Sequence, residues 1–282
     1  MVRLPKITRN ALPLRASARK ATLAGPAAAR YGRWAWLGGV SGALSALVWF
    51  APAAWLAAGV AHASAGQVQI ADARGSVWQG SGQLLLTGGV SSNDVAVLPD
   101  RLQWQLWPTL TGLKGTVLSQ CCSPAPMQLQ IKPQWGGGQL DIRELKINLP
   151  AEILAGLGTP WNTLSPQGKL ALRADTLAVQ WIEGRALFNG NATLDMTDIS
   201  SRLSTLRPLG DYRLSMMGGE APSLQLQTLQ GALQLTGSGQ WVGSRMRFTG
   251  EASASPEREA ALANLLNIIG RRQGNKSLIS LG

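Results

Sequence analysis

The longest uncharged stretch of this chain limits what its first sixty residues can form. Residues 34–60 read WAWLGGVSGALSALVWFAPAAWLAAGV, which is 27 positions without a charged side chain. About 20 apolar residues in a helix cross a hydrocarbon core of about 30 Å. Trp34, Trp36 and Trp55 lie near the two ends, as tryptophans do at membrane interfaces. The stretch therefore predicts a transmembrane helix over residues 34–60, because a core helix of this length would carry a polar face.

The basic tail before this stretch predicts its orientation. Residues 1–33 contain eight Lys or Arg side chains and no Asp or Glu. Positive residues stay on the cytoplasmic side of a first span, so we expect a cytoplasmic tail at 1–33 and an exported domain at 61–282. The alternative is a cleaved signal peptide ending at Ala61, His62 and Ala63. Secretory apolar regions are about 7 to 15 residues long, so the length favours an uncleaved signal anchor.

The net charge of +11 comes mainly from that tail. The other 249 residues carry 18 basic and 15 acidic side chains. Nucleic-acid binders spread cations over a folded face among stacking aromatics, so we expect no nucleic-acid partner. We expect membrane lipid to be a partner through the anchor. Within the apolar stretch, Gly38, Gly42 and Ala46 recur every fourth residue, a spacing that allows a helix–helix contact in the membrane.

The exported part alternates between apolar and polar residues in short runs separated by Gly, Pro, Ser and Asn. Alternation with a period of two places one set of side chains on a buried face of a strand. Many such runs, with few helical patterns between them, predict an all-β domain with a curved, mostly antiparallel sheet. The clearest runs lie at residues 68–70, 83–86, 102–106, 127–131, 170–172, 177–181, 185–194, 212–216, 224–227, 232–236 and 245–249.

One short C-terminal helix is predicted at residues 256–270. Ser255 precedes Pro256, an arrangement typical of a helix start, and Gly270 marks the stop. A single apolar stripe with helical spacing runs along it, formed by Leu262, Leu265, Leu266 and Ile269. The stripe predicts that the helix covers an end or an open face of the sheet. A second short helix is expected at residues 151–156. Similar Trp–Gly–strand blocks about 100 residues apart suggest two related β-units, about residues 61–150 and 165–255.

The sequence offers little material for catalysis. The chain has one histidine, His62, next to the predicted membrane exit, and two cysteines. No nucleophile elbow, phosphate-binding loop or zinc motif is present. Asp195 and Asp198 lie three apart and are interpreted as solvated acids at a strand end and turn. We therefore expect no enzyme activity, no catalytic residues, no metal site and no cofactor.

The adjacent cysteines Cys121 and Cys122 form a possible disulfide. Thiols in an oxidising exported compartment tend to be oxidised. A bond between neighbours is strained, so both a loop disulfide and two free thiols remain open.

Several segments of the exported domain resemble the type II secretion system protein N family. They read GSVWQGSG at residues 75–82, LPDRLQWQLWP at 98–108, LQLTGSGQW at 233–241, FTGEA at 248–252 and GRRQGNKSLISLG at 270–282. Together with the anchor, the resemblance covers roughly residues 30–282. It implies an accessory, single-span protein of the bacterial inner membrane with a periplasmic domain. Its partners would be other inner-membrane and periplasmic subunits of the apparatus that exports folded proteins across the outer membrane, and it implies no catalytic residue.

A different class of function is an anchored lipid or envelope-component carrier, in which a curved sheet holds its ligand in an apolar groove. Leu224, Leu226, Leu233 and Leu235 distinguish the two hypotheses. If these side chains line an open groove, lipid carriage gains support. If they meet a covering layer, support goes instead to the scaffold hypothesis, in which the chain is a structural subunit of the secretion apparatus that binds other subunits. The natural mode of contact for such a scaffold is strand addition at a sheet edge.

Overall fold

The computed structural model describes residues 32–89, 94–182, 185–242 and 245–281. The chain divides into two compact units, Met1–Leu47 and Val48–Gly282, and each is described by itself. The predicted cytoplasmic tail lies outside the described residues except for its last two positions. The described part of the first unit belongs to α1 (Gly32–Trp49), whose final residues fall in the second unit.

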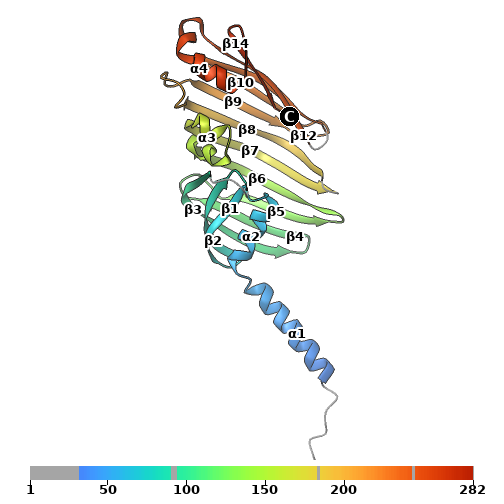
Figure 1. Cartoon of the computed structure of the whole chain (residues 1–282). Helices are drawn as coiled ribbons and strands as arrows, with labels where there is room; N and C mark the ends of the chain where they lie inside the picture. The colour runs from blue at the N-terminus through green and yellow to red at the C-terminus, as the bar shows by residue number, and fades with distance from the viewer. Residues whose placement is uncertain (1–31, 90–93, 183–184, 243–244, 282) are drawn as a thin grey trace, which may run out of the picture. The chain divides into compact units, whose positions relative to one another are not determined.

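The second unit is built on one sheet, shown in Figure 1. Its strands are β1 (Val68–Gly75), β2 (Gln79–Thr87), β3 (Val95–Thr109), β4 (Gly112–Ser119), β5 (Met127–Gln134), β6 (Gly137–Pro150), β7 (Gln167–Ile182), β8 (Arg185–Ser200), β9 (Gly210–Met217), β10 (Ser223–Gly231), β11 (Leu233–Val242), β12 (Arg245–Ala254), β13 (Arg271–Gln273) and β14 (Lys276–Leu281). The remaining helices are α2 (Ala53–Ala63), the 3₁₀ helix η1 (Ala151–Leu157), α3 (Trp161–Leu164), the 3₁₀ turn η2 (Pro256–Arg258) and α4 (Glu259–Ile269).

The fourteen strands follow chain order from β1 to β12, and β14 and then β13 complete the sheet. Every neighbouring pair is antiparallel. The predicted fold class is confirmed in its main part, a mostly antiparallel sheet with one short C-terminal helix. Both predicted β-units lie in this single sheet, and their relationship stays a prediction.

The apolar run 34–60 is divided between two helices. α1 ends at Trp49, and α2 begins at Ala53 after Pro52, whose backbone is extended. Proline disfavours helical backbone in the residue before it and lacks an N–H group, so it interrupts the helix here. α2 lies along β1, and Ala53 is buried. Among the described residues, no helix has both the length and the apolar character that a membrane crossing demands.

α4 covers the C-terminal end of the sheet, as the stripe of leucines predicts. Leu262, Leu265 and Leu266 are buried in a cluster that includes Tyr212 from β9 and Leu233 from β11. Burial raises the pKa of the Tyr212 phenol, whose hydroxyl donates a hydrogen bond to the carbonyl of Leu233 at 3.1 Å.

The two ends of this helix differ in detail from the prediction. Ser255 makes no side-chain capping bond, and Pro256 opens the 3₁₀ turn η2 instead of α4. Gly270 has an extended backbone, and a Cβ there would lie 2.3 Å from the carbonyl oxygen of Leu278. The helix therefore ends at Gly270 because its backbone comes close to the backbone of Leu278 in β14.

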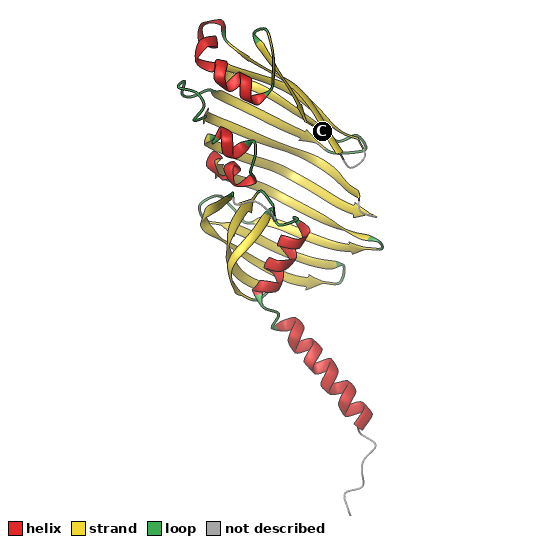
Figure 2. Ribbon diagram, viewed as in Figure 1, coloured by secondary structure: helices red, strands yellow, loops and turns green. Residues whose placement is uncertain are grey.

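A second cluster lies around η1, the helix predicted at 151–156. Ala151 and Ile153 pack with Leu98 of β3 and Leu170 of β7, and leucines of β2 and β8 join them. Strands four positions apart in the sheet can meet the same short helix only if the sheet curls around it. Figure 2 shows η1, α3 and α4 on one side of the sheet, which leaves its other face uncovered in the described residues.

Candidate interaction surfaces

The uncovered face of the sheet is polar, because the register aligns the polar positions of successive strands. Gln105 of β3 lies opposite Thr116 of β4, which lies opposite Gln128 of β5. The row continues through Arg143 of β6 to Thr176 of β7. Apolar residues of the same strands, such as Leu98 of β3, Ile147 of β6 and Leu170 of β7, pack in the cluster around η1 on the other side. Strands rich in Gln favour such a sheet, in which one face is packed on the core and the other is exposed to solvent.

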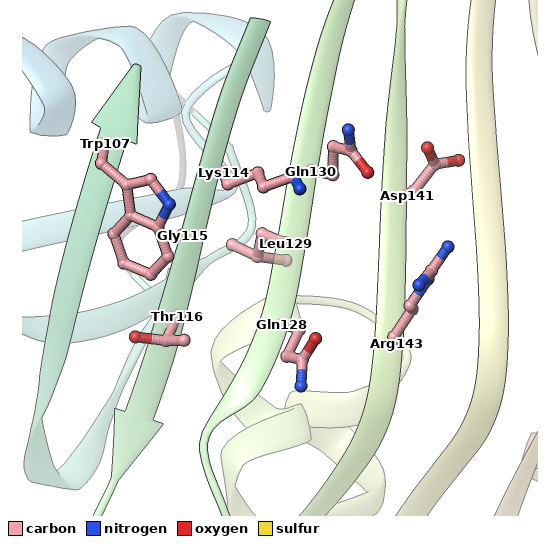
Figure 3. Close-up of a pocket in the computed structure, with 9 residues that line it drawn as sticks. All are labelled: Trp107, Lys114, Gly115, Thr116, Gln128, Leu129, Gln130, Asp141 and Arg143. Atoms are coloured by element: carbon pink, nitrogen blue, oxygen red, sulfur yellow. The ribbon is translucent and has the colours of Figure 1, made fainter. Parts of the chain in front are cut away.

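A shallow pocket of about 340 Å³ lies on this polar face over β3 to β6. Figure 3 shows its lining, in which Trp107 and Lys114 stand on neighbouring strands and Asp141 and Arg143 lie two strands away. Gln128 and Gln130 of β5 occupy the floor between them. The pocket thus offers amide groups, two cations, one carboxylate and one indole ring, a set suited to polar contact with a partner.

The carboxylate of the pocket is held in its charged form. Lys132 Nζ lies 2.8 Å from Asp141 Oδ2, and Gln139 Nε2 donates to Asp141 Oδ1. Partial burial works to raise the pKa of Asp141, but hydrogen bonds from Lys132 and Gln139 and the nearby charges of Lys132 and Arg143 bring it below the ordinary value. Asp141 is therefore ionised at neutral pH and is unsuited to give a proton.

The interpretation of Asp195 and Asp198 as solvated acids at a strand end and turn is wrong for Asp195, whereas Asp198 is exposed two residues before the end of β8. Both lie within β8, where a register shift between Met196 and Ile199 and a φ of 56° at Asp198 mark a β-bulge. The Asp195 side chain is only 13% exposed and pairs with Arg213 at 2.6 Å and Arg173 at 3.3 Å. Its hydrogen bond and charge raise the pKa of Arg213. Asp195 thus links three strands on the polar face.

The two edges of the sheet differ in how they are covered. β1 forms one edge, and α2 packs along it. At the other edge β13 has three residues and pairs only with Lys276, Ser277 and Leu278 of β14. Within the described residues, the rest of β14 has β12 on one side and no strand on the other. An open strand edge presents unpaired backbone groups to which another chain can add.

A cavity of about 640 Å³ adjoins this C-terminal edge. Arg271 and Gln273 of β13 line it on one side, and Thr249, Glu251 and Ser280 line it on the other. Lys276 Nζ pairs with Glu251 Oε2 at 2.8 Å beside it. The C-terminal edge of the sheet therefore combines unpaired backbone groups of β14 with polar side chains. Sequence reasoning missed it, although the Gly274–Asn275 turn between Arg271 and Leu281 is a hairpin signal.

Most of the four leucines that test lipid carriage are packed against other residues of the protein. Leu233 is buried beneath α4, and Leu226 and Leu235 pack against the same cluster. Leu224 lies closer to the β9–β10 turn and is half-buried. This is the covering layer that favours the scaffold hypothesis over an open lipid groove at this end of the sheet.

Cys121 and Cys122 form a disulfide in the turn after β4. The Cys121 N–H donates to Asp100 Oδ2 at 3.1 Å, and the carbonyl of Cys122 accepts from Asn148 N–H at 2.7 Å, so the turn is tied to β3 and β6.

The small residues of the predicted helix contact lie on α1. Gly38, Gly42 and Ala46 are exposed there, and a Cβ at either glycine would meet no atom within 4 Å. His62 lies in α2. Across the described ranges, no group of three or more His, Cys, Asp or Glu side chains could hold a metal ion.

Comparison with known proteins identifies one relationship. The family model described as type II secretion system (T2SS), protein N, matches residues 66–278, which span the sheet from the start of β1 to all but the last three residues of β14. Neither the curated proteins nor the solved structures contain a significant match to the chain.

Proposed function

The chain belongs to the type II secretion system protein N family, and we propose that it is an accessory inner-membrane subunit of that system. In this role the sheet is a periplasmic scaffold that binds other secretion subunits. The observation that carries the proposal is the family match across the whole sheet. It is supported by the open β14 edge and by polar surfaces that lack a catalytic arrangement among the described residues.

The open edge suggests how a partner is bound. A partner segment in extended conformation can add to β14 through main-chain hydrogen bonds, and the adjoining cavity gives its side chains specific contacts. The shortness of β13 and its Arg271 and Arg272 are features that discourage indiscriminate edge pairing. The edge is thus suited to one partner rather than to aggregation.

The proposed anchor is the apolar segment, with residues 34–50 in the bilayer and the N-terminus in the cytoplasm. Its support is the exposure of large apolar side chains along α1 and immediately after it, among them Leu37, Leu44, Leu47 and Phe50. The eight cations of the tail support the orientation. The glycines at 38 and 42 and Ala46 are then available to a second membrane helix.

Photocrosslinking in living cells tests the edge contact. We expect the photoreactive residue p-benzoylphenylalanine, placed at Gln273 or Ser280 of the full chain, to form light-dependent adducts with another secretion subunit. Both positions are exposed at the cavity beside the open edge. Mass spectrometry of the adduct identifies the captured protein.

The matched control is the same substitution at Gln225. This residue is exposed on the polar face of β10, which has β9 and β11 on its two sides. The proposal requires little or no adduct from Gln225. Equal adducts from all three positions, or none from the edge positions in a membrane-associated chain, would count against strand addition at β14.

A further inference from the structure

Two hairpin tips of the sheet carry apolar side chains that nothing in the described structure covers. Leu110, in the β3–β4 turn, and Trp135, in the β5–β6 turn, have relative exposures of 107% and 105%. Trp107, near the first of these turns, is 43% exposed. Turn positions are usually filled by Gly, Asn, Asp, Ser or Pro. Fully exposed leucine and tryptophan at neighbouring tips therefore mark an interaction surface.

The chain enters the second unit at this same end of the strands. The indole N–H of Trp78, in the β1–β2 turn, donates to the carbonyl of Val48 at 2.7 Å, and the Trp78 ring packs against Trp49 with centroids 6.2 Å apart. The carbonyl of Trp78 accepts from Leu106 N–H at 2.6 Å. A continuous series of contacts thus joins the last turn of α1 to β3, four residues before Leu110.

We propose that the β3–β4 and β5–β6 tips insert into the interfacial layer of the phospholipid bilayer. The inference rests on the proposed function, because it takes the bilayer to be the one that holds residues 34–50. Tryptophan favours the membrane–water interface, where its ring is apolar and its N–H can bond to water or head groups. Lys114, which pairs across from Trp107, supplies a cation for anionic head groups. The sheet is then held against the membrane at its hairpin end, and its C-terminal edge stays free.

Lipid photolabelling of the reconstituted full chain tests this surface. The vesicles contain phosphatidylethanolamine and phosphatidylglycerol, with a diazirine on the acyl chains of a fraction of the lipid. We expect lipid adducts on peptides that contain Leu110 and Trp135, in addition to adducts on residues 34–50. Replacing both tip residues in one chain, Leu110→Gln with Trp135→Gln, is expected to abolish the tip adducts and leave the anchor adducts unchanged.

The control pair has the same two residue types at the opposite end of the strands. Trp161 is 39% exposed in α3, and Leu229 is 47% exposed near the end of β10. Peptides containing them should carry no lipid, and Trp161→Gln with Leu229→Gln should leave the tip adducts intact. Adducts confined to residues 34–50 would overturn the inference while the proposed anchor stands. Absence of adducts at residues 34–50 would instead contradict the anchor itself.

Discussion

Replacing Leu266 with alanine is expected to lower the free energy of unfolding of the strand-built domain by about 2–5 kcal/mol, the range for large-to-small changes in a core. Leu266 is fully buried in the cluster between α4 and the sheet. Its carbonyl also accepts a hydrogen bond from Ser277 Oγ at 2.6 Å, which joins α4 to β14. Urea denaturation of the full chain in detergent, followed by circular dichroism of the strands, measures the change.

Ile268 provides the control within the same helix. It is exposed, so Ile268→Ala is expected to change stability by no more than about 0.5 kcal/mol, as is usual for surface positions. Equal effects of the two substitutions would show that α4 is not packed on the sheet as described. The C-terminal edge would then lack its support, because β13 and β14 follow directly from this helix.

Replacing Trp104 with alanine is expected to cost about 3–5 kcal/mol, as for other buried aromatic residues. Trp104 is 3% exposed on β3, and its indole N–H lies 3.2 Å from the carbonyl oxygens of Ser76 and Val77. The ring fills space that a Cβ at Gly80 would enter. The substitution should therefore loosen the β1–β2 hairpin and the residues around Val48 that it holds, which hydrogen exchange of residues 68–87 will measure.

The control for this substitution is Trp107→Ala on the same strand. Trp107 is exposed on the polar face, so its loss should leave both unfolding and exchange close to those of the unchanged chain. Faster exchange of residues 68–87 in Trp107→Ala than in Trp104→Ala would contradict the described packing of the hairpin.

The sequence predicted the sheet well where one face of a strand is apolar and the other is polar but uncharged. Residues 102–106 and 127–131 show this pattern, and they lie in β3 and β5. β4 and β6 were not predicted. Gly115 interrupts the apolar positions of β4, and Glu144, with a φ of 56°, shifts the alternation of β6 so that Ile142 and Leu145 both face the core. A search for strict alternation misses strands of both kinds.

The candidate surfaces were harder to predict because they depend on distant pairing. Asp195 looked like a solvated acid, since neither Arg173 nor Arg213 is near it in sequence. Antiparallel pairing of β7, β8 and β9 brings the three together. The C-terminal edge likewise exists only because β14 pairs with β12 across the intervening helix α4. The local alternation of residues shows on which face of its strand a side chain lies. Its neighbours on other strands are set by the topology of the sheet.

The proposed function makes use of three separate regions of the second unit. The hairpin end is proposed to meet the membrane, the C-terminal edge is proposed to bind secretion subunits, and the helix-covered face forms the core. None of these roles requires a reactive group, which agrees with an accessory subunit whose family is one of secretion components. The arrangement depends on the domain lying on the periplasmic side of the inner membrane.

Protease accessibility in spheroplasts tests that claim most directly. With the outer membrane opened and the inner membrane intact, added protease is expected to digest residues beyond about 60. The N-terminal tail, with the apolar segment, should remain protected in a fraction that resists carbonate extraction. A domain that is degraded only after the inner membrane is lysed, or that is recovered free of membranes, would contradict the account.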